Sequence, residues 1–266
     1  MIVTDEGFDL IEFPLMDPYA FDVAVARQAL DEHCIAATGS LGLNESTDIS
    51  SEDPSAVRAG EALLGRAVEV LADLGSQHLC GIIYSAMRKY MEPATPEGIA
   101  NSQRVLGRIA ERGEKLGVRV SLEVTNRYES NVINTARQAR AFVGAVGLPN
   151  LGIHLDTYHM NIEESDMFSP VLETADALRY VHIGESHRGY LGSGNVDFDS
   201  FFKALGRISY DGPIVFESFS SAVVAPDLSR MLGIWRNLWS DSEDLGAHAN
   251  RFIRDKVTAT QSIQNH

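Results

Sequence analysis

Four side chains that can ligate a metal ion stand at or near the ends of four successive predicted strands. They are Glu123, Asp156, His182 and Glu217. A buried, ionised carboxylate is costly unless it is paired or coordinates a metal. One strand-end carboxylate is most often a helix cap or an ion-pair partner, whereas four such residues favour a shared site. Three carboxylates and one imidazole suit a hard or borderline divalent ion, Mn²⁺, Mg²⁺ or Co²⁺, rather than a sulfur-rich zinc site.

Further polar residues lie in the loops predicted after three of these strands. They are Glu129, His159 in DTYHMN, and Arg188 in HIGESHRG. Each alone is as compatible with a solvated loop as with a functional role. His154 stands two residues before a predicted ligand on the same strand, so we expect it one layer lower, as a hydrogen-bonded core histidine or a support for the site.

Short apolar runs alternate with longer amphipathic stretches along the chain, a pattern that predicts parallel strands joined by crossover helices. Seven strands are predicted, in FDLIEF, CIAATGS, HLCGIIY, VRVSLE, LGIHLD, YVH and PIVFE. Helices are predicted at 22–33, 54–74, 96–116, 135–146, 171–177, 198–208 and 228–239. No linker interrupts the series, so we predict one domain over residues 1–266, a TIM (β/α)8-type barrel with its chemistry at the carboxyl ends of the strands.

One strand of that barrel is missing from the prediction. Gly7 is typical of a helix stop, with 1–6 as the last helical turn, so the chain is expected to begin inside the first unit, without the first strand and most of the first helix. An open barrel exposes unpaired strand edges, which folded proteins normally cover. We therefore expect a clipped or late-started N-terminus, and a higher melting temperature for a chain extended upstream.

Composition excludes several functional classes. The 266 residues carry a formal net charge of -15 and a pI of about 4.9, so no basic surface is available for nucleic acid or anionic membranes. Two cysteines, Cys34 and Cys80, cannot build a disulfide framework, and no apolar run of about 18 residues is present to span a membrane. The acidic start lacks the features of a secretion signal, and we expect a soluble cytoplasmic protein.

At these residues the sequence resembles the ketose 3-epimerases, the D-tagatose, D-psicose (allulose) and L-ribulose 3-epimerase group of the xylose-isomerase-like barrels. The matching stretches are SLEVTNRYE, HLDTYHMNIEE, HIGESHRGYLGSG, FESF and, near the start, FDLIEFP. The intervals also match, with 33 residues from Glu123 to Asp156, 26 from there to His182 and 35 from there to Glu217. The resemblance covers essentially the whole chain, although the family's first strand, which contributes to the apolar side of the pocket, is absent here.

The resemblance implies a role for each residue of the site. The family's metal ligands map onto Glu123, Asp156, His182 and Glu217, with Mn²⁺ as the first choice of metal. Its substrate-binding residues map onto Glu129, His159 and Arg188, and its apolar wall onto Phe219 and Tyr84. The implied reaction is inversion at C3 of a free ketose through a C2–C3 enediolate, with Glu123 and Glu217 exchanging protons on opposite faces of the sugar. A homodimer or homotetramer is expected from family habit.

Three alternatives stay open at this point. The nearest is a metal-dependent aldose–ketose isomerase, including the hydroxypyruvate-isomerase type, which moves the carbonyl between C1 and C2. A metal-dependent phosphodiesterase or nuclease would call for more histidine ligands and a basic groove, which this acidic chain lacks. A sugar-binding module without turnover would not need two facing glutamates.

Overall fold

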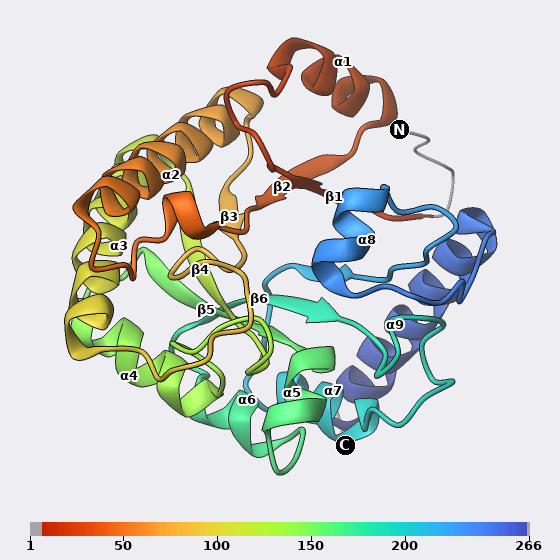
Figure 1. The fold of residues 1–266 in the computed structure, drawn as a ribbon. Coiled ribbons are helices and arrows are strands. Elements are labelled where there is room, and N and C mark those ends of the chain that lie inside the picture. The colour runs from red at the N-terminus through yellow and green to blue at the C-terminus, as the bar shows by residue number, and fades with distance from the viewer. Residues whose placement is uncertain (1–6, 265–266) are drawn as a thin grey trace.

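Seven parallel strands pair in the order in which they occur in the sequence and curve into a nearly closed barrel, as the computed structural model shows over residues 7–264 (Figure 1). The strands are β1 (Leu10–Pro14), β2 (Ala36–Ser40), β3 (His78–Cys80), β4 (Arg119–Val124), β5 (Leu151–Asp156), β6 (Leu178–Ile183) and β7 (Ile214–Phe216). The number of strands and the fold class confirm the sequence prediction.

The longer helices lie around the outside of the barrel, whereas the short helix α8 (Pro226–Leu232) lies over it (Figure 1). In chain order, the helices are α1 (Val23–His33), α2 (Pro54–Leu74), α3 (Pro96–Leu116), α4 (Ala136–Val146), α5 (Thr157–Glu163), α6 (Ser169–Glu173), α7 (Phe198–Arg207), α8 (Pro226–Leu232) and α9 (Ser242–Gln264), with a short 3-10 helix η1 (Glu45–Thr47). Within residues 7–264, none of them has both the length and the apolar character required to cross a membrane.

Helices α2 and α3 have the boundaries that their sequences predict, because both ends carry strong signals. Each begins with a proline, and the side chains of Asp53 and Thr95 accept hydrogen bonds from the first-turn N–H groups. Each ends at a glycine with left-handed backbone, Gly75 or Gly117.

Other helices differ from the prediction. The helix predicted at 228–239 is Pro226–Leu232, because Gly233 (φ 66°) ends it with its N–H bonded to the carbonyls of Arg230 and Ser229. The helix predicted at 171–177 is Ser169–Glu173. Helices α5 and α9 were not predicted; α9 packs against α7 through Phe252 and Phe198, whose ring centroids are 5.2 Å apart.

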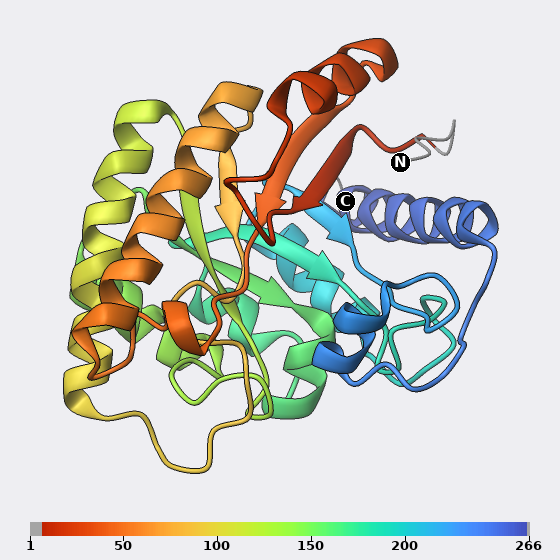
Figure 2. The same ribbon diagram turned by 45° about the horizontal axis from the view of Figure 1, so that its top comes forward.

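The barrel has an open side between β1 and β7, which are the two ends of the strand order. Figure 2 shows α9, in dark blue, on this side of the molecule beside the start of the red β1. Arg254 on α9 donates a hydrogen bond of 2.7 Å to the carbonyl of Gly7, which ties the segment before β1 to that helix. The predicted helical turn at 1–6 lies outside the described residues.

Alternate residues of the strands point into the barrel and form layers, as the strand repeat requires. One layer holds Thr38, His78, Ser121, His154 and Tyr180. Thr38 Oγ1 lies 2.6 Å from the Tyr180 hydroxyl, and His78 Nε2 lies 2.9 Å from Ser121 Oγ. Residues two positions further along β4, β5 and β6 form the next layer, which places the predicted metal ligands of these strands at the carboxyl ends.

One glycine at this end of the barrel cannot be replaced without strain. Gly81 follows β3 with φ 114°, and a Cβ there would lie 2.4 Å from the carbonyl oxygen of Leu41. Its own carbonyl accepts the N–H of Glu123 at 3.1 Å, so its position also sets that of a predicted ligand.

Gly81→Ala is expected to lower the free energy of unfolding by about 3 kcal/mol, because a strained backbone and a backbone clash act together. Gly144→Ala is the matched control, since Gly144 is exposed on α4 with open space around it, and should raise stability by about 0.5–1 kcal/mol. Denaturant unfolding of both variants measures this; an unchanged midpoint for Gly81→Ala would contradict the strain argument.

Candidate functional site

Three of the four predicted ligands meet at one point inside the barrel. Ligand atoms of Glu123, Asp156 and His182 all lie within 4.8 Å of one another, and the three residues are buried. Nδ1 of His182 is buried and has no hydrogen-bond partner in the described part of the chain. It lies 3.9 Å from Oε1 of Glu123 and 3.9 Å from Oε2 of Glu217. An unpartnered imidazole nitrogen facing carboxylate oxygens fits a hard or borderline divalent cation.

Each predicted ligand is held by the element that carries it. Asp156 ends β5 and is the N-cap of α5, and its carboxylate accepts the N–H of Tyr158 at 2.7 Å. His182 is paired with Asp156 in the β5–β6 register. Glu217 directly follows β7, and its N–H donates to the carbonyl of Ile183 at 3.1 Å.

Arg188 brings a positive charge into this group of carboxylates. Its Nη1 lies 3.1 Å from Oδ2 of Asp156 and also contacts Oε2 of Glu217. The guanidinium carbon lies 3.8 Å from the ring centroid of Tyr158 and 5.3 Å from that of Phe219. Burial disfavours the charged guanidinium, but Glu217 and Asp156 outweigh it and raise the pKa of Arg188, which therefore stays charged.

The carboxyl of Glu217 is poised between its two protonation states. Burial raises its pKa, the charges of Arg188 and His182 lower it, and the nearby carboxylates of Asp156 and Glu123 raise it, with a resulting pKa of about 7. A carboxyl group that titrates near neutral pH can both accept and release a proton during a reaction.

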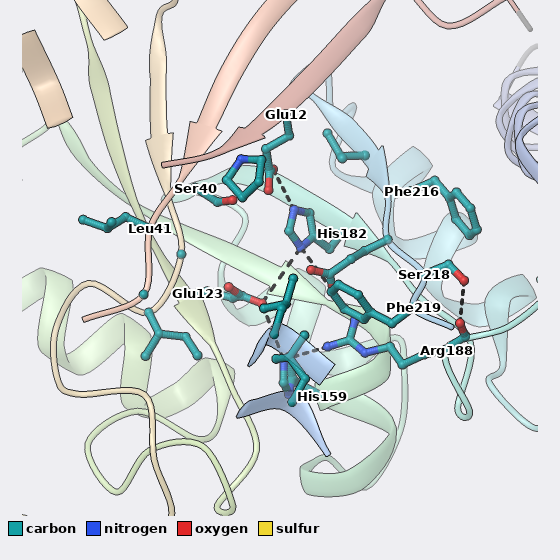
Figure 3. Close-up of a pocket in the computed structure, with 18 of the residues that line it drawn as sticks. Glu12, Ser40, Leu41, Glu123, His159, His182, Arg188, Phe216, Ser218 and Phe219 are labelled. Atoms are coloured by element: carbon teal, nitrogen blue, oxygen red, sulfur yellow. Dashed lines mark hydrogen bonds and ion pairs between the residues drawn. The ribbon is translucent and has the colours of Figure 1, made fainter. Parts of the chain in front are cut away.

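His159 and Glu129 lie next to the cluster. The backbone N–H of Asn126 donates to Nδ1 of His159 at 3.1 Å, so the ring's proton is on Nε2. That Nε2 lies 3.5 Å from Oε1 of Glu123 and faces the cavity side (Figure 3). The amide of Asn126 also donates to Oε1 of Glu129 at 3.0 Å.

A cavity of about 450 Å³ opens from this polar cluster toward the gap between β1 and β7. Glu123, Glu129, His159, His182, Arg188, Glu217 and Phe219 contribute to its lining. Apolar side chains that sequence reasoning missed also line the cavity, among them Met16, Met87, Leu228, Met231 and Leu232. The last three lie on α8, whose true position the prediction did not give. The volume is in the range of small-molecule sites.

The placement of Tyr84 and the hydrogen bonding of His154 differ from the prediction. Tyr84 was expected at the apolar wall, but it is fully buried away from the cavity lining, and its hydroxyl donates to the carbonyl of Ile133 at 3.1 Å. His154 is buried as expected, yet neither ring nitrogen has a hydrogen-bond partner among residues 7–264. Its ring packs against those of Tyr180 and His182 instead, at 4.9 and 4.1 Å between centroids, and burial lowers its pKa well below the usual range.

Glu12 is the polar residue of the site that sequence reasoning left out. Its Oε2 accepts a hydrogen bond from Nε2 of His182 at 2.8 Å (Figure 3). It also accepts one from the Tyr180 hydroxyl at 2.7 Å. Burial opposes its ionisation, but His182 and the hydrogen bonds outweigh burial and lower the pKa of Glu12 to about 2. The available signal was a carboxylate inside the apolar run FDLIEF.

Comparisons with known proteins place the chain in a family. The xylose isomerase-like TIM barrel family model matches residues 2–255. A ketose 3-epimerase of Arthrobacter globiformis is 71% identical over 262 residues, which cover 98% of this chain and 91% of the relative. The crystal structure of a D-allulose 3-epimerase from Methylomonas sp. in complex with D-allulose has a TM-score of 0.93 and 52% identity, covering 94% of this chain and 87% of that one. A structure of an L-ribulose 3-epimerase has a TM-score of 0.94 and 39% identity, covering 98% and 88%.

The chain belongs to the xylose isomerase-like TIM barrel family and, within it, to the ketose 3-epimerases. These are epimerases of the isomerase class, which agrees with the resemblance in its sequence.

Mn²⁺ is expected to raise the melting temperature of the wild-type protein, because an ion that binds only the folded state stabilises it by about 2.7 kcal/mol at 100 times its Kd. Asp156→Asn should lose most of this Mn²⁺-dependent increase. Glu114→Gln, at an exposed position on α3, should keep it and serves as the control. Melting curves with Mn²⁺ and with EDTA test this; an equal increase in the Asp156 variant would remove Asp156 from the metal site.

Proposed function

We propose that this protein inverts the configuration at C3 of a free ketose, with residues 1–266 acting as one barrel domain. The ketose 3-epimerase relatives support a reaction of this kind. The structural observation that carries the proposal is the position of two glutamates, Glu123 and Glu217, each 3.9 Å from the same unpartnered nitrogen of His182. They come from β4 and from the end of β7, with β5 and β6 between them, so they approach the site from different sides.

The proposed metal ligands are Glu123, Asp156, His182 and Glu217, with Mn²⁺ as the first choice and Mg²⁺ or Co²⁺ as alternatives. When bound, the ion supplies Lewis-acid polarisation of the sugar's carbonyl and neighbouring hydroxyl oxygens, which makes the hydrogen at C3 more acidic.

Inversion requires a proton acceptor on one face of C3 and a proton donor on the other, with a C2–C3 enediolate between the two steps. Glu123 and Glu217 take these roles and exchange them when the reaction runs in reverse. The pKa of about 7 supports this role for Glu217, because such a carboxyl group releases and regains a proton at little cost near neutral pH.

The remaining polar residues orient the sugar. His159 Nε2–H and the guanidinium of Arg188 are donors aimed at the cavity, and we assign them to oxygens near C2. Glu129 is assigned to the O1 end, where its carboxylate accepts a hydrogen bond from the sugar hydroxyl. Phe219 lines the cavity and covers the apolar face of the sugar. Tyr84 takes no part in this site.

With Mn²⁺ and a panel of D-tagatose, D-fructose, D-psicose and L-ribulose, the expected product in each active case is the C3 epimer, still a ketose. In deuterated water, deuterium should appear at C3 during turnover, because the enediolate route exchanges that hydrogen. An aldose product would identify the alternative, an aldose–ketose isomerase. A C3 epimer without deuterium would contradict the enediolate.

Glu217→Gln is expected to lower turnover by about 10²–10⁴-fold at saturating Mn²⁺, because a group that moves a proton in the transition state is worth about that much. Glu123 remains active in this variant and reaches only one face of C3. Deuterium should therefore still enter C3 of the epimer whose hydrogen lies on that face, and not C3 of the other epimer. Glu185→Gln is a control, since Glu185 is buried after β6 and bonded to the N–H groups of Ser186 and Gly192, outside the cavity lining. Near-wild-type turnover of Glu217→Gln would refute the acid/base role.

A further inference from the structure

We infer that Glu12 is a positioning residue for the metal site, which holds the ring of His182 so that Nδ1 faces the carboxylates. The inference rests on the proposed function, because it concerns the metal that Glu123, Asp156, His182 and Glu217 are proposed to hold. Glu12 itself would not touch the ion or the sugar's reacting atoms. Its action goes through His182.

The hydrogen bond between Glu12 and His182 decides which ring nitrogen carries the proton. Oε2 of Glu12 lies 2.8 Å from Nε2 of His182, and an ionised carboxylate only accepts hydrogen bonds. Nε2 must therefore carry a hydrogen, so that in the neutral ring Nδ1 keeps its lone pair. That Nδ1 is the buried atom without a hydrogen-bond partner among the described residues, and it faces Glu123 and Glu217. A metal-ligating histidine needs this tautomer and this orientation.

Glu12 is itself held in place by a chain of donors. The Tyr180 hydroxyl donates to the same Oε2 at 2.7 Å, which leaves Thr38 Oγ1 to donate to the Tyr180 oxygen at 2.6 Å. The Sγ of Cys80 lies 3.5 Å from Oε2 as a weak donor. The Glu12 side chain is only 12% exposed, so few competing water contacts are available to it. The carboxylate is therefore fixed from β2, β3 and β6 as well as from its own strand.

The contact also explains why an acid stands in β1 at all. β1 ends the strand order, and its hydrogen-bonded neighbour is β2, whereas His182 belongs to β6. Figure 3 shows the Glu12 side chain reaching from β1 toward His182, which lies between Glu12 and Glu123. A buried ion pair that only stabilised the barrel would not need to leave the opposite ring nitrogen free and aimed at three carboxylates.

The test compares the Mn²⁺ affinity of three variants. Affinity is measured from the decrease of the electron paramagnetic resonance signal of free Mn²⁺ as the protein binds the ion. Glu12→Leu removes the acceptor and is expected to weaken Mn²⁺ binding by about 10–100-fold. Glu12→Gln can place its amide oxygen at the Oε2 position and should recover most of that loss. Tyr180→Phe disturbs the same network without removing the acceptor of His182, and should change affinity less than about threefold.

A second readout reports on the ring itself. In the Co²⁺-loaded protein, Nε2–H of a histidine bound through Nδ1 gives a strongly shifted proton resonance that disappears on exchange with deuterated water. A hydrogen bond to buried Glu12 should make this exchange slow in the wild type and in Glu12→Gln, and fast in Glu12→Leu. Thermal melting of the metal-free variants measures structural damage separately, since lost stability would speed exchange at protected sites throughout the protein and not at one ring nitrogen alone.

The outcomes separate this inference from the proposed function. Wild-type Mn²⁺ affinity and slow exchange in Glu12→Leu would overturn the positioning role while leaving the metal site intact. Equal losses of affinity in Glu12→Leu, Glu12→Gln and Tyr180→Phe would mean that Glu12 only supports the surrounding structure and does not orient His182. If the wild type bound neither Mn²⁺ nor Co²⁺, the proposed metal site would fail, and this inference with it.

Discussion

The structure depends on balancing several charges that are buried at one end of the barrel. Glu12 lies 2.8 Å from one ring nitrogen of His182, Glu123 and Glu217 each lie 3.9 Å from the other, and Asp156 belongs to the same cluster as Glu123 and His182. Each of these carboxylates would be costly to ionise alone in a low-dielectric interior. Without a bound ion, the positive charges of Arg188 and of a protonated His182 compensate these carboxylates, because Glu12 and Glu217 outweigh burial and raise the pKa of His182 to about 10. Any cation held there would share Asp156 and Glu217 with Arg188.

The backbone around Arg188 shows what this balance demands of the fold. Arg188 has a left-handed φ of 62°, unusual for a residue with a side chain. Its N–H donates to the carbonyl of Glu185 at 2.8 Å, and its carbonyl accepts the N–H of Phe219 at 3.1 Å and the hydroxyl of Ser218 (Figure 3). These hydrogen bonds join the loop after β6 to the segment after β7. They place the guanidinium between Asp156 and Glu217, which come from different strands.

Sequence reasoning located those residues whose position follows from a local rule. Side chains alternate along a strand, and barrel sites lie at the carboxyl ends of the strands, so Glu123, Asp156 and His182 could be placed together. Proline and glycine signals located the ends of α2 and α3. Glu12 was missed because it stands inside a strand, and its partner His182 lies 170 residues away, beyond any local pattern. Tyr84 was misplaced because β3 ends at Cys80, before it, so the alternation of the strand does not set its direction. Its ring packs near Phe142 of α4, a contact that only tertiary packing decides. Helix α9 was missed because its apolar side chains are interrupted by many polar ones.

The open side of the barrel determines how the cavity can distinguish sugars. At its inner end charged and hydrogen-bonding groups converge, and groups of this kind discriminate strongly because a missing hydroxyl leaves them unpaired. Toward the gap between β1 and β7, the lining consists largely of side chains such as Leu10, Ile11 and Met231, the last from α8 rather than from a strand. An apolar wall distinguishes one methylene by only about 1–3 kcal/mol and rejects an added hydroxyl weakly. Under the proposed function, selectivity is therefore concentrated at C1 to C3, while the tail of the ketose meets a surface that tolerates differences in length and configuration.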